Sequence, residues 1–206
     1  MVIGVTGGLG SGKSSVCRLF EACGAHVIEA DRTGREVVED PDVLKALVVA
    51  LGADILAEAG RLDRRRLGQR AFADAVSRGR LNGIVWPPLV RKLRADVEAA
   101  LRERPGRPVV VDAALLVEWG DLSWLDALVV VTAGEQVRKR RMMARMGLSE
   151  QEVEARMRAQ QPEGEKVRRA DYVIVNDGAE EELTAQASGV WKRLLAGNRV
   201  FGKAEK

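Results

Sequence analysis

The stretch VIGVTGGLGSGKSSV, residues 2–16, decides the fold. It opens on an apolar, β-branched run that is typical of a buried strand. The glycine-rich loop that follows, from Gly7 to Ser14, matches the pattern G-x-x-x-x-G-K-[ST]. From Lys13 onward the apolar residues recur at helical spacing, up to a glycine stop at Gly24. A strand, a glycine loop and a helix in this order predict a phosphate-binding P-loop.

The composition of this loop suits a nucleoside triphosphate and a magnesium ion. Glycines tolerate positive φ angles and let backbone N–H groups turn inward around phosphate oxygens. The helix that begins near Lys13 adds the positive end of its dipole. Lys13 is expected to reach the β and γ phosphates, and the Ser14 hydroxyl to ligate Mg²⁺. The predicted nucleotide-binding residues of the loop are Gly8, Gly10, Ser11, Gly12, Lys13, Ser14 and Ser15.

Four further short runs rich in β-branched residues lie at residues 26–30, 108–116, 127–132 and 171–175. Each is almost continuously apolar, as expected of strands that are buried on both faces of a parallel sheet. Helical patterns lie between the strands, so the predicted fold is α/β, with a doubly wound, five-stranded parallel sheet of the P-loop kinase type. Right-handed crossovers then bring the carboxyl ends of the strands, and the site with them, to one edge.

Two segments between the strands are too long for simple crossovers. Residues 31–107 read as helical throughout, with PDVLKALVVALG opening on a first-turn proline and LDRRRLGQRAFADAV and PPLVRKLRADVEAALRER following it. They predict a helical subdomain. Residues 135–161 predict two basic helices that look like a lid. The helices are expected to meet at a break beside Gly147, where Ser149 and Glu152 form a capping-box pattern.

Composition bounds the class of protein. The chain has 206 residues, of which 46% are hydrophobic, and this predicts one compact unit with a sizeable core. Two cysteines, Cys17 and Cys23, and one histidine, His26, fit neither a disulfide framework nor a zinc site. No apolar run approaches about 18 residues, and no secretory leader pattern precedes the first strand. We therefore expect a cytoplasmic protein with no membrane partner.

The net charge of +3, spread over residues of both signs, indicates a mixed solvated surface and disfavours nucleic acid as a partner. Basic residues do cluster at 61–70 and 137–145. A small phosphorylated ligand would account for these clusters as well as DNA or RNA would. The P-loop itself names no reaction, but a GTPase would need a guanine-reading N-K-x-D stretch, which the sequence lacks.

Three carboxylates and two arginines are candidates for the chemistry. Asp31 follows the second strand, where it could accept the proton of an attacking hydroxyl or cap the next helix. Asp112 ends the third strand, with Glu118 beyond it, and could face Mg²⁺ or be a buried structural carboxylate. Arg141 and Arg145 share one helix face and could close over the phosphates or form a solvated basic face. The residues alone leave these alternatives open.

Several motifs, in order over residues 2–185, resemble the dephospho-CoA kinase family. GVTGGLGSGKSSV resembles the family's T-G-G-I-G-S-G-K-S, and VIEADRTGREVV resembles its V-I-D-A-D segment. GRLDRRRLGQRAF is similar to G-x-L-D-R-x-x-L-x-x-x-V-F, LNGIVWPPLV to L-N-x-I-x-H-P-x-V, and ALLVEWG to P-L-L-F-E. RMMARMGLSEQEVEARMRAQ matches R-x-x-x-R-x-G-L-S followed by R-x-x-x-Q, and ADYVIVNDG resembles A-D-x-V-I-x-N-x-G.

The resemblance implies a kinase that transfers the γ-phosphate of ATP to the 3′-hydroxyl of the ribose of dephospho-CoA. It implies that Asp31 is the general base, and that Arg141 and Arg145 are lid arginines that stabilise the transferred phosphoryl group together with Lys13 and Mg²⁺. It also implies that Asn176 lies near the adenine of ATP. The implied division is a nucleotide-binding core (residues 1–30, 108–140 and 166–198), a CoA-substrate subdomain (31–107) and a lid (141–165).

Four positions depart from the family's pattern: Glu29, Trp86, Ala114 and Arg138 stand where the family usually has aspartate, histidine, proline and glutamine. Trp86 bears on the acceptor pocket, because an indole ring can stack on adenine but cannot replace the hydrogen bonds of an imidazole. One alternative function is a kinase for another nucleoside or nucleotide. The LDR, LN and P motifs of the helical segment 31–107 argue against it. The other is a nucleotide-binding protein that uses its basic helices on nucleic acid. The sequence gives no oligomeric state.

Overall fold

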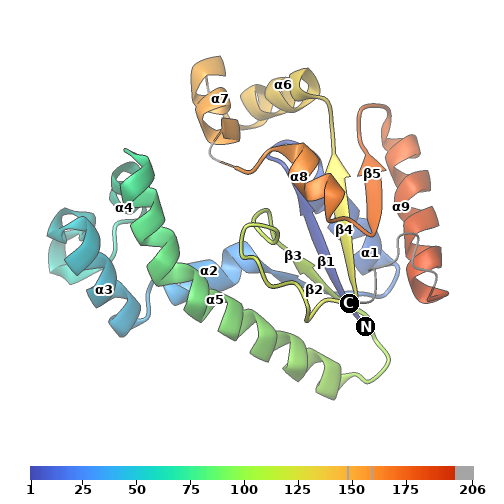
Figure 1. Ribbon diagram of the computed structural model, residues 1–206, viewed down its shortest axis with the longest axis horizontal. Coiled ribbons are helices and arrows are strands. Elements are labelled where there is room, and N and C mark those ends of the chain that lie inside the picture. Colours follow the sequence, from blue (N-terminus) through green and yellow to red (C-terminus); the bar gives the residue numbers. More distant parts are fainter. Residues whose placement is uncertain (148, 159, 198–206) are drawn as a thin grey trace. The chain divides into compact units, whose positions relative to one another are not determined.

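The computed structural model describes residues 1–147, 149–158 and 160–197 (Figure 1). Asn198, the last residue of the predicted core, lies outside the described residues. The chain divides into two compact units. We call Met1–Ile28 together with the chain from Val97 onward the sheet unit, and Glu29–Asp96 the helical unit. No helix in the described part of the chain is long and apolar enough to cross a membrane.

The sheet has five strands in the order β2-β3-β1-β4-β5. The strands are β1 (Val2–Gly7), β2 (His26–Glu29), β3 (Val109–Asp112), β4 (Ala127–Thr132) and β5 (Tyr172–Val175). β1 pairs in parallel with β3 and β4, and β4 pairs in parallel with β5. The predicted α/β fold and its five strands are confirmed, although the third strand ends at Asp112, before the end of its apolar run. Because β1 lies at the centre, the P-loop leaves the middle of the sheet.

Helices cover the sheet on both faces, which explains why every residue of β1 is buried. α1 (Lys13–Ala22) and α9 (Glu180–Leu195) pack on one face, where the ring centroids of Phe20 and Trp191 lie 5.0 Å apart. α8 (Glu163–Arg168) contacts β1 and β4, and Figure 1 shows it in front of these strands, with α1 fainter behind them. The core of the sheet unit therefore fixes the strand from which the P-loop starts.

Two helices follow β4: α6 (Glu135–Met146) and α7 (Glu150–Arg158). Gly147 ends α6 with φ +64, a left-handed backbone that favours glycine. The predicted capping box is present, because the backbone N–H of Ser149 donates to Glu152 Oε2 at 2.9 Å and the N–H of Glu152 donates to Ser149 Oγ at 3.4 Å. The hydroxyl and the backbone N–H of Ser149 both donate to the Glu152 carboxyl and lower its pKa. The break between the two predicted helices is confirmed.

The helical unit contains α2 (Ala30–Val37), α3 (Pro41–Leu51), α4 (Arg64–Ala71) and the part of α5 (Ala75–Glu103) that precedes Val97. Two short 3₁₀ turns, Ala53–Ile55 and Glu58–Gly60, connect α3 to α4. Each of α3 and α4 begins at an aspartate cap. Asp40 accepts from the N–H of Asp42 at 3.0 Å, and Asp63 accepts from the N–H of Arg65 at 2.9 Å.

The helical boundaries after residue 62 differ from the sequence prediction. LDRRRLGQRAFADAV does not form one helix, since α4 ends at Ala71 and α5 starts at Ala75. α5 then continues through Pro87 and Pro88, where a new helix would be expected from the sequence. A proline inside a helix removes one hydrogen bond to the preceding turn, and exposure of Gly83 and Pro87 lets water take the freed carbonyl. Apolar packing of Val85, Leu89 and Leu93 outweighs this loss.

Candidate active site

The P-loop runs from the carboxyl end of β1 to the first turn of α1. Gly10 and Gly12 have φ angles of +81 and +91, which a residue with a side chain rarely adopts. The N–H of Ser11 donates to Gly8 O at 3.0 Å, and the N–H of Ser15 donates to Gly12 O at 2.9 Å. Gly12 is the N-cap of α1 and provides no side-chain acceptor for the first N–H groups of the helix. The loop therefore presents a concave backbone and an uncapped helix end, which suit an anion.

Lys13 forms an ion pair with Asp112 Oδ1 at the end of β3. Both side chains are largely buried, with 15% and 9% of their surface exposed. The sequence allows Asp112 to be either a Mg²⁺ partner or a structural carboxylate, and in this structure it is the counter-ion of the P-loop lysine. A cation and a carboxylate thus face each other beside the anion cradle.

Asn176, which follows β5, is bonded to the P-loop. Its side-chain Nδ2 donates to Ser11 O at 2.8 Å, and its backbone N–H donates to Thr132 O at 2.8 Å. A side-chain carbon added at Gly12 would overlap Asn176 Nδ2. The resemblance places Asn176 near the adenine of ATP. The hydrogen bond to Ser11 shows that Asn176 also holds the backbone of the P-loop in place.

Arg141 on α6 is bonded to the same asparagine. Its Nη1 donates to Asn176 O at 2.8 Å and its Nη2 approaches Asn176 Oδ1 at 3.3 Å. A chain of hydrogen bonds thus runs from α6 through Asn176 to Ser11 in the loop. Arg145, one turn further along α6, is exposed. The two predicted lid arginines therefore differ, because one is held beside the P-loop and the other faces solvent.

Two side chains that the sequence did not single out as site residues also contact the loop. Gln160 Oε1 accepts a hydrogen bond from the N–H of Leu9 at 2.9 Å. A side-chain carbon added at Gly8 would overlap Arg138 Nη1. In the sequence, Arg138 is a departure from the family's pattern and Gln160 is the last residue of the R-x-x-x-Q motif. No spacing in the sequence signals either contact, since each joins segments more than a hundred residues apart.

Lys166 on α8 is a third site residue that sequence reasoning missed. Its side chain is fully buried, and its Nζ donates to Ala114 O at 2.6 Å and lies 2.9 Å from Glu118 Oε1. The hydroxyl of Thr6 donates to the same Ala114 carbonyl at 3.1 Å. Glu118, a candidate acid in the sequence, is thus the counter-ion of a buried lysine. This pair fixes the turn after β3 against β1 and α8.

A charged cluster joins α6 to α7. Lys139 Nζ lies 2.6 Å from Glu154 Oε1, 3.1 Å from Glu135 Oε1 and 3.9 Å from Glu150 Oε1. The hydrogen bond to Glu154, and then the one to Glu135, raises the pKa of Lys139. The same bond lowers the pKa of Glu154. The ammonium group is therefore held in its charged form between the two helices.

Asp31 belongs to the helical unit and lies in the first turn of α2. The alternative interpretation of Asp31 as a helix cap is wrong, because α2 starts at Ala30 and the cap position is Glu29. The side chain of Glu29 forms no capping hydrogen bond, and Asp31 is exposed. Its carboxylate is thus accessible to a ligand, and the positive end of the helix dipole favours a negative charge there.

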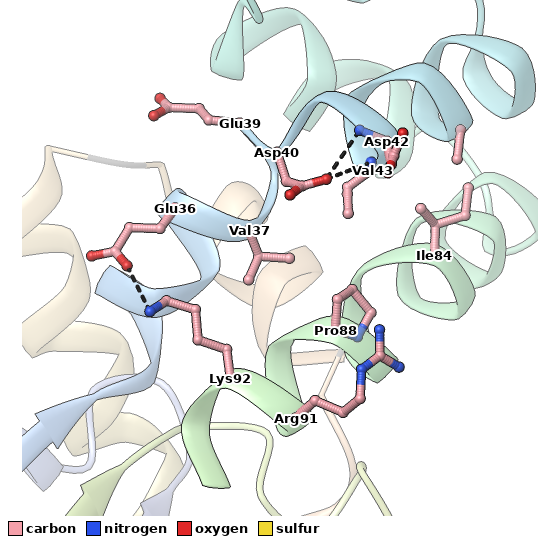
Figure 2. A pocket seen from close by; sticks show the side chains of 11 residues that line it. Glu36, Val37, Glu39, Asp40, Asp42, Val43, Ile84, Pro88, Arg91 and Lys92 are labelled. Atoms are coloured by element: carbon pink, nitrogen blue, oxygen red, sulfur yellow. Dashed lines mark hydrogen bonds and ion pairs between the residues drawn. The ribbon is translucent and has the colours of Figure 1, made fainter. Parts of the chain in front are cut away.

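The helical unit contains a pocket of about 930 Å³ between α2, α3 and α5. Figure 2 shows the side chains that line it. Val37, Val43 and Ile84 are among its apolar residues. Lys92 reaches toward Glu36, with Nζ and Oε2 3.3 Å apart, and this hydrogen bond raises the pKa of Lys92. An apolar lining with charged groups beside it suits a ligand that has both apolar and polar parts.

A second pocket of about 820 Å³ in the same unit is lined by Arg64 and Arg65 of the LDRRR motif and by Arg61, which directly precedes the motif. Arg64 lies 2.5 Å from Glu39, so one of the three is paired with a carboxylate. Trp86 is half-buried on α5 and is not among the described residues that line either pocket. Part of the basic cluster at 61–70 therefore lines this cavity, together with the acidic residues Glu39 and Asp63.

A family model described as Dephospho-CoA kinase matches residues 1–182. The chain belongs to the dephospho-CoA kinase family. A dephospho-CoA kinase of Geobacillus kaustophilus is 40% identical over 194 residues, which are 94% of this chain and 96% of the relative. Membership of this family, which the motifs predict, is confirmed.

Solved structures agree with the family fold. A crystal structure from Thermus thermophilus has a TM-score of 0.78 and 35% identity and covers 98% of both chains. The structure of a dephospho-CoA kinase from Campylobacter jejuni, at 21% identity, has a TM-score of 0.71 over 96% of this chain and 98% of its own. The predicted P-loop kinase fold of the dephospho-CoA kinase family is thereby confirmed.

Proposed function

We propose that this member of the dephospho-CoA kinase family transfers the γ-phosphoryl group of ATP to the 3′-hydroxyl of the ribose of dephospho-CoA, with Asp31 as the general base. The reaction breaks the bond between the γ-phosphorus and the oxygen that bridges it to the β-phosphate. It forms a bond to the ribose oxygen, and the products are ADP, coenzyme A and one proton. The family match over residues 1–182 is the observation that carries the proposal.

The P-loop would bind the triphosphate. Gly8, Gly10 and Gly12 would contribute backbone N–H groups to the cradle. The N–H groups of Ser11 and Ser15 donate within the loop, so these two residues would contribute to the shape of the cradle. Lys13 would exchange its bond to Asp112 for the β and γ phosphates, or share it with them. Asn176 would hold the loop in shape through Ser11 while it contributes to the adenine side of the site.

Mg²⁺ is part of this proposal. Its protein ligands would be the hydroxyl of Ser14 and, through its free lone pairs, the carboxylate of Asp112, since hard oxygen donors are those that Mg²⁺ prefers. The ion, when bound, supplies a positive charge that offsets the charge on the phosphate oxygens during transfer. Ser14 is exposed at the first turn of α1, so its hydroxyl is accessible.

Asp31 would accept the proton of the attacking ribose hydroxyl. A base must lie within hydrogen-bond reach of that hydroxyl in the productive complex, and an exposed carboxylate in the first turn of α2 meets the requirement of access. The pockets of the helical unit would hold the rest of dephospho-CoA. The arginine-lined pocket suits its diphosphate, and the pocket beside Val37 and Ile84 suits its pantetheine arm.

Arg141 and Arg145 would act from the lid. Arg145 is exposed and can move toward the phosphates without breaking a bond of the loop. Arg141 is bonded to Asn176, so it can contact a phosphate only if its guanidinium shares or leaves that asparagine. The expected contribution of both is to offset charge during transfer and to exclude water, which would otherwise hydrolyse ATP.

An assay of ADP release tests the proposal. We expect turnover that depends on dephospho-CoA and that Asp31→Asn reduces by at least about 100-fold, since a positioned base typically contributes that much. Asp54→Asn is the matched control and should keep turnover, because Asp54 is another exposed carboxylate of the helical unit and is not among the described residues that line either pocket.

Two results would contradict parts of the proposal. If ADP appears at the same rate with and without dephospho-CoA, the acceptor is wrong. If Asp31→Asn behaves like Asp54→Asn, the acceptor stands and the base is wrong. Salt-sensitive binding of nucleic acid without any turnover would favour the alternative of a nucleic-acid-associated protein.

A further inference from the structure

Arg138 lies against the P-loop in the first turns of α6. Its Nη1 occupies the position that a side chain at Gly8 would need. A side-chain carbon at Gly10 would lie only 2.8 Å from the carbonyl oxygen of Arg138. The guanidinium and the backbone of this residue therefore meet the loop at two of its glycines. Both partners belong to the sheet unit.

Among the described residues, the carboxylate that faces this guanidinium does not form a hydrogen bond with it. The facing carboxylate is Glu163 of α8, but Nη2 and Oε2 are 3.7 Å apart, which is beyond a hydrogen bond. Arg138 Nε and Glu163 Oε1 are both buried and have no hydrogen-bond partner among the described residues. Only 12% of the Arg138 side chain is exposed. A guanidinium has five N–H donors, and a buried donor such as Nε that is left unpaired away from water is unfavourable.

The charged groups around the P-loop indicate which hydrogen-bond acceptor the N–H donors of Arg138 would bind. Lys13 and Arg138 both adjoin the P-loop, and each faces a carboxylate: Lys13 faces Asp112, and Arg138 faces Glu163. The P-loop is a cradle for phosphate, and guanidinium matches phosphate oxygens in two-point hydrogen bonds. A polyphosphate in the loop would place several negative oxygens within a few ångströms of Gly8.

We propose that Arg138 is a phosphate-binding residue of the nucleotide site, and that Glu163 holds its guanidinium beside the loop until the polyphosphate of a nucleoside triphosphate enters. The inference rests on the proposed binding of ATP by the P-loop. On binding, the guanidinium donates to phosphate oxygens, and the loose pair with Glu163 gives way to charge-assisted hydrogen bonds. Glu163 is then a competitor of the ligand.

Calorimetric titration without acceptor tests this arrangement, with ATP and with inorganic tripolyphosphate as the two probes. Arg138→Gln should weaken both probes about tenfold, the effect of one lost charge-assisted hydrogen bond. Glu163→Gln should tighten both about threefold, because the competing negative charge is gone. The opposite signs are decisive, since a merely structural ion pair would weaken binding in both variants. Arg140→Gln, an exposed arginine of the same helix, is the control for the change of net charge.

The remaining variants separate the possible failures. Arg138→Lys keeps the charge but loses the two-point geometry, so its affinity should lie between wild type and Arg138→Gln. If wild type binds neither probe, the proposed function fails. If wild type binds and Lys13→Ala does not, while Arg138→Gln and Glu163→Gln both match wild type or both weaken binding, the role of Arg138 is overturned and ATP binding by the P-loop stands.

Discussion

The sheet unit and the helical unit hold their charged groups in opposite ways. In the sheet unit, Lys13 is 15% exposed and is paired with Asp112 beside the P-loop, and Lys166 is fully buried and is paired with Glu118 at the turn after β3. In the helical unit, Lys92 is 39% exposed and its partner Glu36 is 50% exposed. The difference indicates that the nucleotide end of the protein is preorganised by buried pairs. The groups around the pockets of the helical unit can rearrange with little loss of free energy.

The largest expected effect comes from breaking a buried pair. Lys166→Met should lower the free energy of unfolding by about 3–5 kcal/mol, because it leaves Glu118 buried without its counter-ion. Urea denaturation measures this loss. The matched variant in the helical unit, Lys92→Met, should cost less than about 1 kcal/mol. Equal losses in the two variants would remove the contrast between the units.

Gly12→Ala should weaken ATP binding by about 100-fold. The alanine would need a φ of +91 and would overlap Asn176 Nδ2, so the loop would lose the contact that fixes Ser11. Gly24→Ala is the control, because Gly24 has a similar φ of +101 but open space around it. If both variants keep full affinity in a nucleotide titration, the fixed loop is not required for binding.

A smaller effect is expected from a helix cap in the helical unit. Asp40→Ala should lower the free energy of unfolding by about 1 kcal/mol, because the N–H groups of Asp42 and Val43 lose their acceptor. Thermal unfolding followed by circular dichroism measures the change. Asp42→Ala, in the first turn of the same helix, removes a charge without removing the cap and should change stability less.

The smallest effect concerns pH at the hinge between α6 and α7. The bonds from Ser149 lower the pKa of Glu152 below its ordinary value of 4.5. A lowered carboxyl pKa stabilises the folded state above the ordinary value, and this contribution disappears as the pH falls through the lower, folded-state pKa. The difference in stability between wild type and Ser149→Ala should therefore narrow below about pH 4. A difference that grows toward acid would contradict the sign.

The strands, the P-loop and the capping box could be predicted because each is determined by a few residues that are close together in the sequence. Val2 to Ser14 contains a strand and the whole phosphate cradle, and Ser149 with Glu152 contains a complete cap. The continuous course of α5 from Ala75 through Pro87 and Pro88 could not be predicted, because packing of its apolar face outweighs the effect of the two prolines. The helix propensity of neighbouring residues does not include such packing.

The bonds that tie the site together also could not be predicted. Asn176 reaches Ser11, Gln160 reaches Leu9 and Lys166 reaches Ala114, and in each case the partners lie on elements that only the folded sheet brings together. Such contacts depend on three-dimensional distance and not on spacing in the sequence. For Lys166, a lysine among exposed charged residues looks the same in the sequence whether it is buried or solvated.

The hydrogen bond from Leu9 to Gln160 makes one backbone amide of the P-loop a natural reporter. In a ¹⁵N-labelled sample, the chemical shift and solvent exchange of the Leu9 amide should change whenever Gln160 releases this hydrogen bond. A single peak would then report the contact between Gln160 and the P-loop during a titration, without any attached dye.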